Sequence, residues 1–256
     1  MTLYMPDTNV WVGVGKEADL TRRCDKSLAN GDVFLIAPPA LIEVVRGMVR
    51  YGKEKFLDDQ KTFGWMQKSN CKILELTKPF MARRLRTRVS ASGVIPEHYW
   101  QLIEMIAGAA SFDEFVKNSN AANSVWKNIE DLDQIHEQEI EKELRALEQL
   151  AAKKRPFEIP KHLSNWFGAP GCRPHPVIIE RTFSAAIEYL ETSIRKVANG
   201  AKPRKNDRGL YVDYQLLMYL ADSEINFLTN EDFSGEISKS SQRARIVKTD
   251  VLPPVV

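Results

Sequence analysis

The sequence is poor in cysteine, in long apolar runs and in excess charge of either sign. Its three cysteines, Cys24, Cys71 and Cys172, lie far apart without a CxxC pair, which argues against a disulfide framework and a cysteine zinc site. No apolar run approaches membrane-spanning length, and the first residues lack the basic region and long apolar core of a secretion signal. These absences lead us to expect a cytoplasmic protein that has no membrane partner.

The charge balance says little about a partner by itself. The chain has 36 basic and 34 acidic residues among 256, a formal net charge of +2, and 43% hydrophobic residues. This composition is ordinary for a soluble globular protein, and the length suits one large domain or one domain with an elaboration. So weak an excess neither demands nor excludes a nucleic-acid partner, and the placement of the charges matters more than their sum.

Three common catalytic motifs are missing. The stretch GVGK at 13–16 does not belong to a GxxxxGK[ST] phosphate loop, and there is no GxSxG elbow of a serine hydrolase. A dehalogenase-like phosphatase would need a second aspartate two residues after Asp7, where Asn9 stands. Nucleotide-triphosphate hydrolysis through a phosphate loop and serine-dependent acyl transfer are therefore disfavoured.

Short apolar runs alternate with helical patterns in the first third of the chain and near its end. Strands are expected at 3–5, 33–37, 72–76, 225–229 and 244–249, and helices at 10–28, 39–52, 53–68 and from near Asp213. Between about 78 and 197 helical periodicity is almost continuous and is clearest over 129–154. We therefore predict an α/β fold with a parallel sheet flanked by helices, formed by 1–92 and 200–256, and a mostly helical insertion over 93–199.

Acidic residues follow the predicted strands. Asp7 comes directly after the first strand, Glu43 lies in the first turns of the helix after the second, and Asp213 is expected to cap the helix that leads to the fourth. Each has an ordinary alternative reading, because Asp7 and Asp213 suit a helix cap and Glu43 suits a solvated helix face near Arg46. The carboxyl ends of parallel strands meet at one edge, however, and carboxylates gathered there would repel unless cations lay between them. Together they predict a site for Mg²⁺ or Mn²⁺.

Three stretches, PDTNVWVG, PPALIEVVRG and VDYQLLMYLADSEINFLTNEDF, resemble the PIN domain, a metal-dependent ribonuclease fold found in many bacterial toxins. The match covers about 1–92 and 205–250 and leaves the helical middle unexplained. It implies that Asp7, Glu43 and Asp213 are metal ligands and catalytic residues. It also implies that Thr8, Asn9 and Thr229 are small polar residues that assist the site.

The fourth acid of the PIN pattern falls on the irregular stretch TNEDF at 229–233. The usual pattern is T-N-D-x-D-F, so this chain is one residue short, and either Glu231 or Asp232 is left to supply the ligand. Neighbours in an extended chain face opposite ways, so both cannot aim at one ion without a sharp turn. We prefer Asp232, because its shorter side chain suits a tightly held ion and Phe233 after it can anchor the turn.

The resemblance implies a divalent-metal endoribonuclease that hydrolyses RNA with one or two Mg²⁺ or Mn²⁺ ions. The chain would then have an RNA substrate and, as the toxin of a toxin–antitoxin pair, an antitoxin partner; a homodimer is a further expectation. A second reading is an RNA-processing nuclease that has no antitoxin. A third is a catalytically degenerate PIN-like scaffold that binds RNA or protein through its helical insertion.

Two basic clusters are candidates for contact with RNA phosphates. The first contains Arg83, Arg84, Arg86 and Arg88, and the second contains Lys202, Arg204, Lys205 and Arg208. The alternative for each is a solvated charged face. Because the second cluster lies just before Asp213, it is the stronger candidate.

Overall fold

A five-stranded, all-parallel sheet forms the centre of the protein. The computed structural model describes residues 1–87, 96–121, 138, 145, 149, 159–165, 167, 173–198 and 207–254. The strands are β1 (Leu3–Pro6), β2 (Val33–Ile36), β3 (Lys72–Ile73), β4 (Ile225–Thr229) and β5 (Ile246–Lys248), in the order β3-β2-β1-β4-β5. The predicted parallel α/β sheet is thus confirmed, although β3 is shorter than the expected 72–76.

The order of the strands creates a switch point between β1 and β4. From β1 the chain moves outward to β2 and β3, and it later crosses to the other side to form β4 and β5. Strands β1 and β4 are paired from Leu3 opposite Ile225 to Pro6 opposite Leu228. The Asp7 N–H then donates to the carbonyl oxygen of Leu228 at 2.9 Å, which places Asp7 beside Thr229. In open parallel sheets the crevice at such a switch point is the usual place for a ligand.

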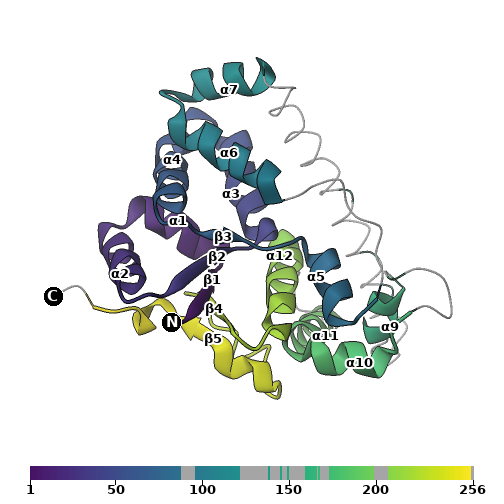
Figure 1. The fold of residues 1–256 in the computed structure, drawn as a ribbon. Coiled ribbons are helices and arrows are strands. Elements are labelled where there is room, and N and C mark those ends of the chain that lie inside the picture. Colours follow the sequence, from purple (N-terminus) through teal and green to yellow (C-terminus); the bar gives the residue numbers. More distant parts are fainter. Residues whose placement is uncertain are drawn as a thin grey trace.

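Helices cover both faces of the sheet. The first part of the chain forms α1 (Thr8–Lys16), α2 (Ala18–Ala29), α3 (Pro38–Tyr51), α4 (Lys53–Lys68) and α5 (Thr77–Arg84). The later described parts form α6 (Pro96–Gly108), α7 (Phe112–Ala121), α9 (Ile159–Ser164), α10 (Pro176–Thr182), α11 (Ser184–Ala198) and α12 (Asp207–Met218). Figure 1 shows α1, α2 and α4 on one side of the sheet and α5, α11 and α12 on the other.

The expected single helix over 10–28 is in fact two helices. Glu17 is extended, with φ −105° and ψ 101°, and the Thr21 hydroxyl donates to the carbonyl oxygen of Val14 at 2.6 Å, which ends α1. Helix α1 also lies very close to α4. A Cβ on Gly15 would lie 2.3 Å from the carbonyl oxygen of Asp58, so only glycine permits this approach.

The helical region between 96 and 198 packs on the sheet-containing body where it is described. Helix α6 contacts α4, and α11 contacts α12. Most of the segment 129–154, the clearest predicted helix, lies outside the described residues. Short 3-10 helices, η1 (Tyr219–Ala221), η2 (Ser241–Arg245) and η3 (Thr249–Val251), connect the elements near the end of the chain.

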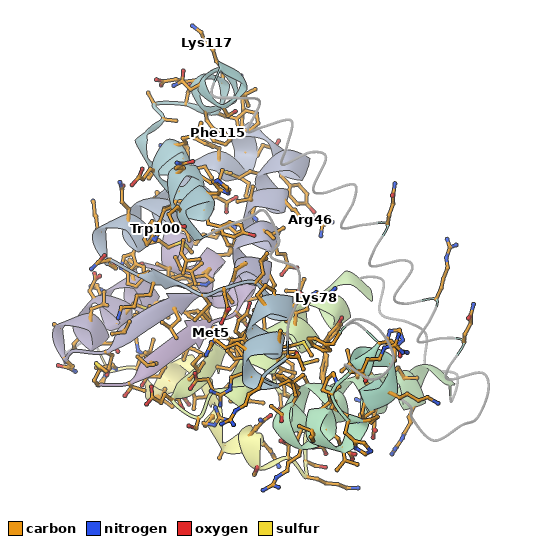
Figure 2. The ribbon with its side chains drawn as sticks, turned by 45° about the vertical axis from the view of Figure 1, so that its right-hand side comes forward. Met5, Arg46, Lys78, Trp100, Phe115 and Lys117 are labelled. Atoms are coloured by element: carbon orange, nitrogen blue, oxygen red, sulfur yellow. The ribbon has the colours of Figure 1, made fainter. Side chains whose placement is uncertain are left out.

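The core is apolar and joins the sheet to the helices around it. Met5 and Phe227 from the central strands are fully buried, as are Trp11 from α1 and Phe115 from α7. Figure 2 shows Met5 in the interior and Lys117 projecting from α7 at the outer edge. Among the described residues, no helix combines the length and the apolar character required to span a membrane.

Candidate functional site

Asp7 is the most buried acid at the switch point. It precedes α1 and is only 5% exposed. Its Oδ1 accepts a hydrogen bond from the Val10 N–H at 2.7 Å, which confirms its role as the helix cap, and its Oδ2 accepts from the Thr229 hydroxyl at 2.5 Å. The register of β1 and β4 places Thr229 there, so sheet pairing orients this carboxylate.

Glu43 and Asp213 come from helices on either side of Asp7. The Thr8 hydroxyl in the first turn of α1 donates to Oε2 of Glu43 at 2.5 Å. The Tyr189 hydroxyl of α11 donates to Oδ2 of Asp213 at 2.7 Å. The prediction that Asp213 caps its helix is wrong, because α12 begins at Asp207 and Asp213 lies within it.

The irregular TNEDF stretch turns Glu231 towards the other acids. Oε1 of Glu231 accepts a hydrogen bond from the Asn9 side-chain amide at 2.7 Å. The backbone N–H of Glu231 donates to the Thr229 hydroxyl at 2.9 Å. Asp232 is exposed instead, and its Oδ1 accepts from the Ser234 N–H at 2.9 Å. The structure thus brings Glu231 to the acids, in contrast to our preference for Asp232.

Strand β5 and the start of η3 explain this orientation. The Lys248 ammonium donates to the carbonyl oxygens of Asn230, at 2.9 Å, and of Glu231. The Thr249 hydroxyl donates to Oδ1 of Asn230 at 2.5 Å. These contacts hold the backbone after β4 in the turn that separates the directions of Glu231 and Asp232.

The pKa values of the two central aspartates are raised. Burial raises the pKa of Asp7 to about 6, with Glu231 and Glu43 adding repulsion and the hydrogen bonds from Thr229 and Val10 opposing the shift. Burial raises the pKa of Asp213 to about 8, opposed by the hydrogen bond from Tyr189 and reinforced by repulsion from Glu231, Glu43 and Asp7. The four acids therefore lie within electrostatic range of one another.

The partners of these carboxylates are uncharged. The hydroxyls of Thr229, Thr8 and Tyr189 donate hydrogen bonds to Asp7, Glu43 and Asp213, in that order. The Asn9 side-chain amide donates to Glu231. Within the described residues, no lysine or arginine forms an ion pair with any of the four acids. In that part of the chain, no three acidic, histidine or cysteine side chains lie close enough together, as placed, to hold one metal ion. We name Asp7, Glu43, Asp213 and Glu231 the acid cluster.

Tyr189 is the site residue that the motifs did not reveal. It lies in the segment predicted as an insertion, 24 positions before Asp213. A lone tyrosine in a helical pattern is an ordinary core residue, so no sequence signal marked it.

Two of the four arginines in the first basic cluster have partners within the protein. Arg83 pairs with Glu75 at 2.5 Å, and Arg84 donates to the carbonyl oxygen of Ala221 at 2.6 Å and lies 3.9 Å from Asp222. These contacts favour a structural role for both arginines. The third member, Arg86, is exposed at the end of the described stretch. The fourth member, Arg88, lies outside the described residues, as do the predicted RNA-binding residues Lys202, Arg204 and Lys205 and the side chain of Arg208.

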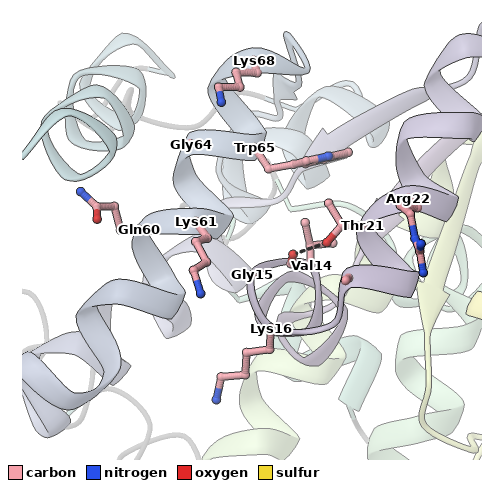
Figure 3. Close-up of a pocket in the computed structure, with 11 residues that line it drawn as sticks. Val14, Gly15, Lys16, Thr21, Arg22, Gln60, Lys61, Gly64, Trp65 and Lys68 are labelled. Atoms are coloured by element: carbon pink, nitrogen blue, oxygen red, sulfur yellow. Dashed lines mark hydrogen bonds between the residues drawn. The ribbon is translucent and has the colours of Figure 1, made fainter.

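A groove of about 660 Å³ lies elsewhere, between α1, α2 and α4 (Figure 3). Its apolar floor includes Trp65, and none of the acid cluster lines it. Several of its basic side chains already have acidic partners: Lys16 and Lys61 lie 3.8 and 3.6 Å from Asp58. The described lining of the groove has no acidic, histidine or cysteine side chain, so we take the acid cluster as the candidate site.

Comparisons of the chain with protein-family models, curated proteins and solved structures give no match. The resemblance to PIN domains therefore rests on the sequence motifs alone.

Proposed function

We propose that this protein is a divalent-metal-dependent endoribonuclease that hydrolyses RNA phosphodiester bonds with Mg²⁺ or Mn²⁺. One observation supports the proposal above all: the acid cluster has four carboxylates within electrostatic range of one another beside the β1–β4 switch point. Their hydrogen-bond donors are neutral, and no cation pairs with them among the described residues. Carboxylates whose only purpose is stability are expected to have basic partners when buried. An acid cluster without them is best explained by an ion that binds there.

The chemistry of the cluster suits a hard divalent ion. Carboxylate oxygens are the ligands that Mg²⁺ and Mn²⁺ prefer, and raised pKa values mark carboxylates that a positive charge would stabilise. All four carboxylates accept a hydrogen bond, and the short side chains of Asp7 and Asp213 form the fixed part of the set. Glu43 and Glu231 have longer side chains, which would turn inward to complete the coordination.

Each residue of the acid cluster would have its own role in the hydrolysis. A bound divalent ion lowers the pKa of a water molecule and stabilises negative charge on phosphate oxygens. Asp7, Asp213 and Glu231 would supply oxygen ligands, and Glu43 would bind the ion or orient the attacking water. Hydrogen bonds from Thr229 and Tyr189 already restrict the two aspartate side chains, so these side chains would lose less rotational freedom when the ion binds.

The choice of RNA as substrate comes from the resemblance to PIN domains. Phosphates need cations besides the metal, and Lys202, Arg204, Lys205 and Arg208 precede Asp213 in the sequence. Their contact with RNA stays a prediction, as do the antitoxin partner and the homodimer.

The test is cleavage of a mixed RNA pool by the purified full-length protein, with Mn²⁺ and with EDTA. Asp7→Asn should reduce Mn²⁺-dependent cleavage at least about a hundredfold, or ~2.7 kcal/mol of barrier, because it removes a charged ligand and keeps the shape of the side chain. Asp59→Asn is the matched control, since Asp59 is also a buried aspartate but pairs with Lys55 on α4, 3.6 Å away. It should leave cleavage within about threefold of wild type.

Two results would overturn the proposal. Equal cleavage by wild type and Asp7→Asn would assign the activity to a contaminant or to another site. RNA binding by the wild type without Mn²⁺-dependent cleavage would favour the degenerate scaffold instead.

A further inference from the structure

Tyr189 links the helical region of the chain to the acid cluster. It lies on α11 and is 6% exposed, and its hydroxyl donates to Oδ2 of Asp213 at 2.7 Å. The protein therefore holds Oδ2 of this carboxylate, and Oδ1 has no hydrogen-bond partner among the described residues.

The ring of Tyr189 also contacts the segment that carries Glu231. It packs against Phe233 with ring centroids 5.5 Å apart, and Phe233 in turn packs against Phe227 of β4 at 5.8 Å. Phe233 lies two residues after Glu231. The same tyrosine thus touches Asp213 through its hydroxyl and the Glu231 turn through its ring.

Neighbouring contacts keep α11 at a fixed position against this turn. The Glu188 carboxylate accepts hydrogen bonds from the backbone N–H groups of Ser238, Lys239 and Ser240. The Ala185 N–H donates to the side-chain oxygen of Gln242 at 3.0 Å. Because Glu188 directly precedes Tyr189, the backbone that presents the tyrosine is tied to the loop after β4.

We infer that Tyr189 is a positioning residue that sets the orientation of Asp213 and of the Glu231 turn for metal binding. This inference rests on the proposed function. A hydroxyl that donates to a metal-binding carboxylate limits its rotation, and loss of such a partner typically weakens metal binding about 10- to 100-fold. A merely structural tyrosine would affect stability and leave the affinity for the metal unchanged.

Mn²⁺ titration of the full-length protein by calorimetry, together with the electron paramagnetic resonance spectrum of bound Mn²⁺, tests this inference. Tyr189→Phe keeps the ring contact with Phe233 and removes only the hydroxyl. We expect its Mn²⁺ dissociation constant to rise about tenfold and its spectrum to change, while KM for RNA at saturating Mn²⁺ stays within about twofold of wild type.

Tyr219→Phe is the matched control. Tyr219 is fully buried. Its hydroxyl donates to the carbonyl oxygen of Glu75 at 2.7 Å and lies 3.4 Å from the Thr77 hydroxyl, so this variant loses the same atom and at least as much hydrogen bonding. Its melting temperature should fall, but its Mn²⁺ dissociation constant should stay within about twofold of wild type.

A double-mutant cycle separates coupling from a general effect on folding. In the Asp213→Asn background, Tyr189→Phe should have little further effect on Mn²⁺ affinity, because the carboxylate that it orients is gone. Mn²⁺ binding by Tyr189→Phe as tight as by wild type, or additive losses in the cycle, would overturn this inference alone. A wild-type protein that binds no Mn²⁺ would overturn both this inference and the proposed function.

Discussion

Asp59 and Asp7 are both buried aspartates, but their surroundings are opposite. Asp59 is fully buried on α4 and lies 3.6 Å from the Lys55 ammonium, and neither of its oxygens has a hydrogen-bond partner among the described residues. Room for that lysine comes from Gly47 of α3, since a Cβ there would lie 2.2 Å from Lys55 Nζ. Asp7 has hydrogen bonds to both oxygens, and its charged neighbours in the cluster are acids.

Burial raises the pKa of either aspartate to about 6, yet the main charged neighbours act on the two pKa values in opposite directions. At Asp59, Lys55 and Lys16 lower the pKa against the desolvation. At Asp7, Glu231 and Glu43 raise it further, and only neutral donors oppose the shift. A raised pKa by itself therefore does not identify a site. The sign of the neighbouring charges does identify one, because only the surroundings of Asp7 are stabilised by an added cation.

The largest expected difference between the two settings is the response to metal. Mn²⁺ that binds the folded wild type should raise the free energy of unfolding by about 2.7 kcal/mol at a hundredfold excess over its dissociation constant. Asp59→Asn should keep this gain and Asp7→Asn should lose it, as measured by melts in EDTA and in millimolar Mn²⁺. Identical melting midpoints of the wild type in EDTA and in Mn²⁺ would mean that Asp7, like Asp59, does not respond to metal.

Without metal, the acid cluster should destabilise the fold at high pH. The pKa of Asp213 is raised from 3.8 to about 8, so as pH rises through this window the unfolded chain loses its proton first and stability falls. Asp213→Asn should therefore be more stable than wild type at pH 9 in EDTA, by about 2 kcal/mol, and equal to it at pH 4. Urea unfolding at both pH values checks this, and a variant less stable at pH 9 would contradict it.

Within the acid cluster, two neighbouring acids should differ in their effect. Glu231→Gln should reduce Mn²⁺-dependent cleavage about tenfold, or ~1.4 kcal/mol, because Glu231 faces the other acids. Asp232→Asn should change it by less than about twofold, because Asp232 is exposed and holds only the Ser234 turn. Initial cleavage rates of both variants test this, and the reverse order would return the fourth ligand to Asp232.

The smallest expected effect concerns the paired aspartate. The raised pKa of Asp59 should make stability fall as pH rises from about 4 to about 6, since the folded state keeps the proton longer than the unfolded one. Asp59→Asn should remove about 1 kcal/mol of this fall, because a neutral amide does not titrate. Urea melts of wild type and variant at pH 4, 5, 6 and 7 in EDTA measure the difference. Parallel curves for the two proteins would mean that Lys55 fully compensates the burial of Asp59.

The elements that sequence patterns predicted well are those that local physics specifies. Helix α4 and strand β4 have the expected bounds, because a run of helical or apolar residues between clear breaks needs little outside help. Asp7 caps α1 as its position before Thr8 and Asn9 suggested. Strand β3 is shorter than its apolar run, and α12 begins before Asp213, because pairing and packing decide where an element ends.

The sequence by itself determined that Asp7, Glu43 and Asp213 belong to elements around one end of a parallel sheet. Only the tertiary structure decided which oxygens these acids present and which residue joins them. Tyr189 reaches Asp213 across two packed helices, and Asn9 reaches Glu231 over 222 positions of the chain. Local pattern does not distinguish Glu231 from Asp232, since the two are adjacent acids. Lys248 of β5 makes the distinction by holding the backbone turn, and its contact exists only once the sheet has formed.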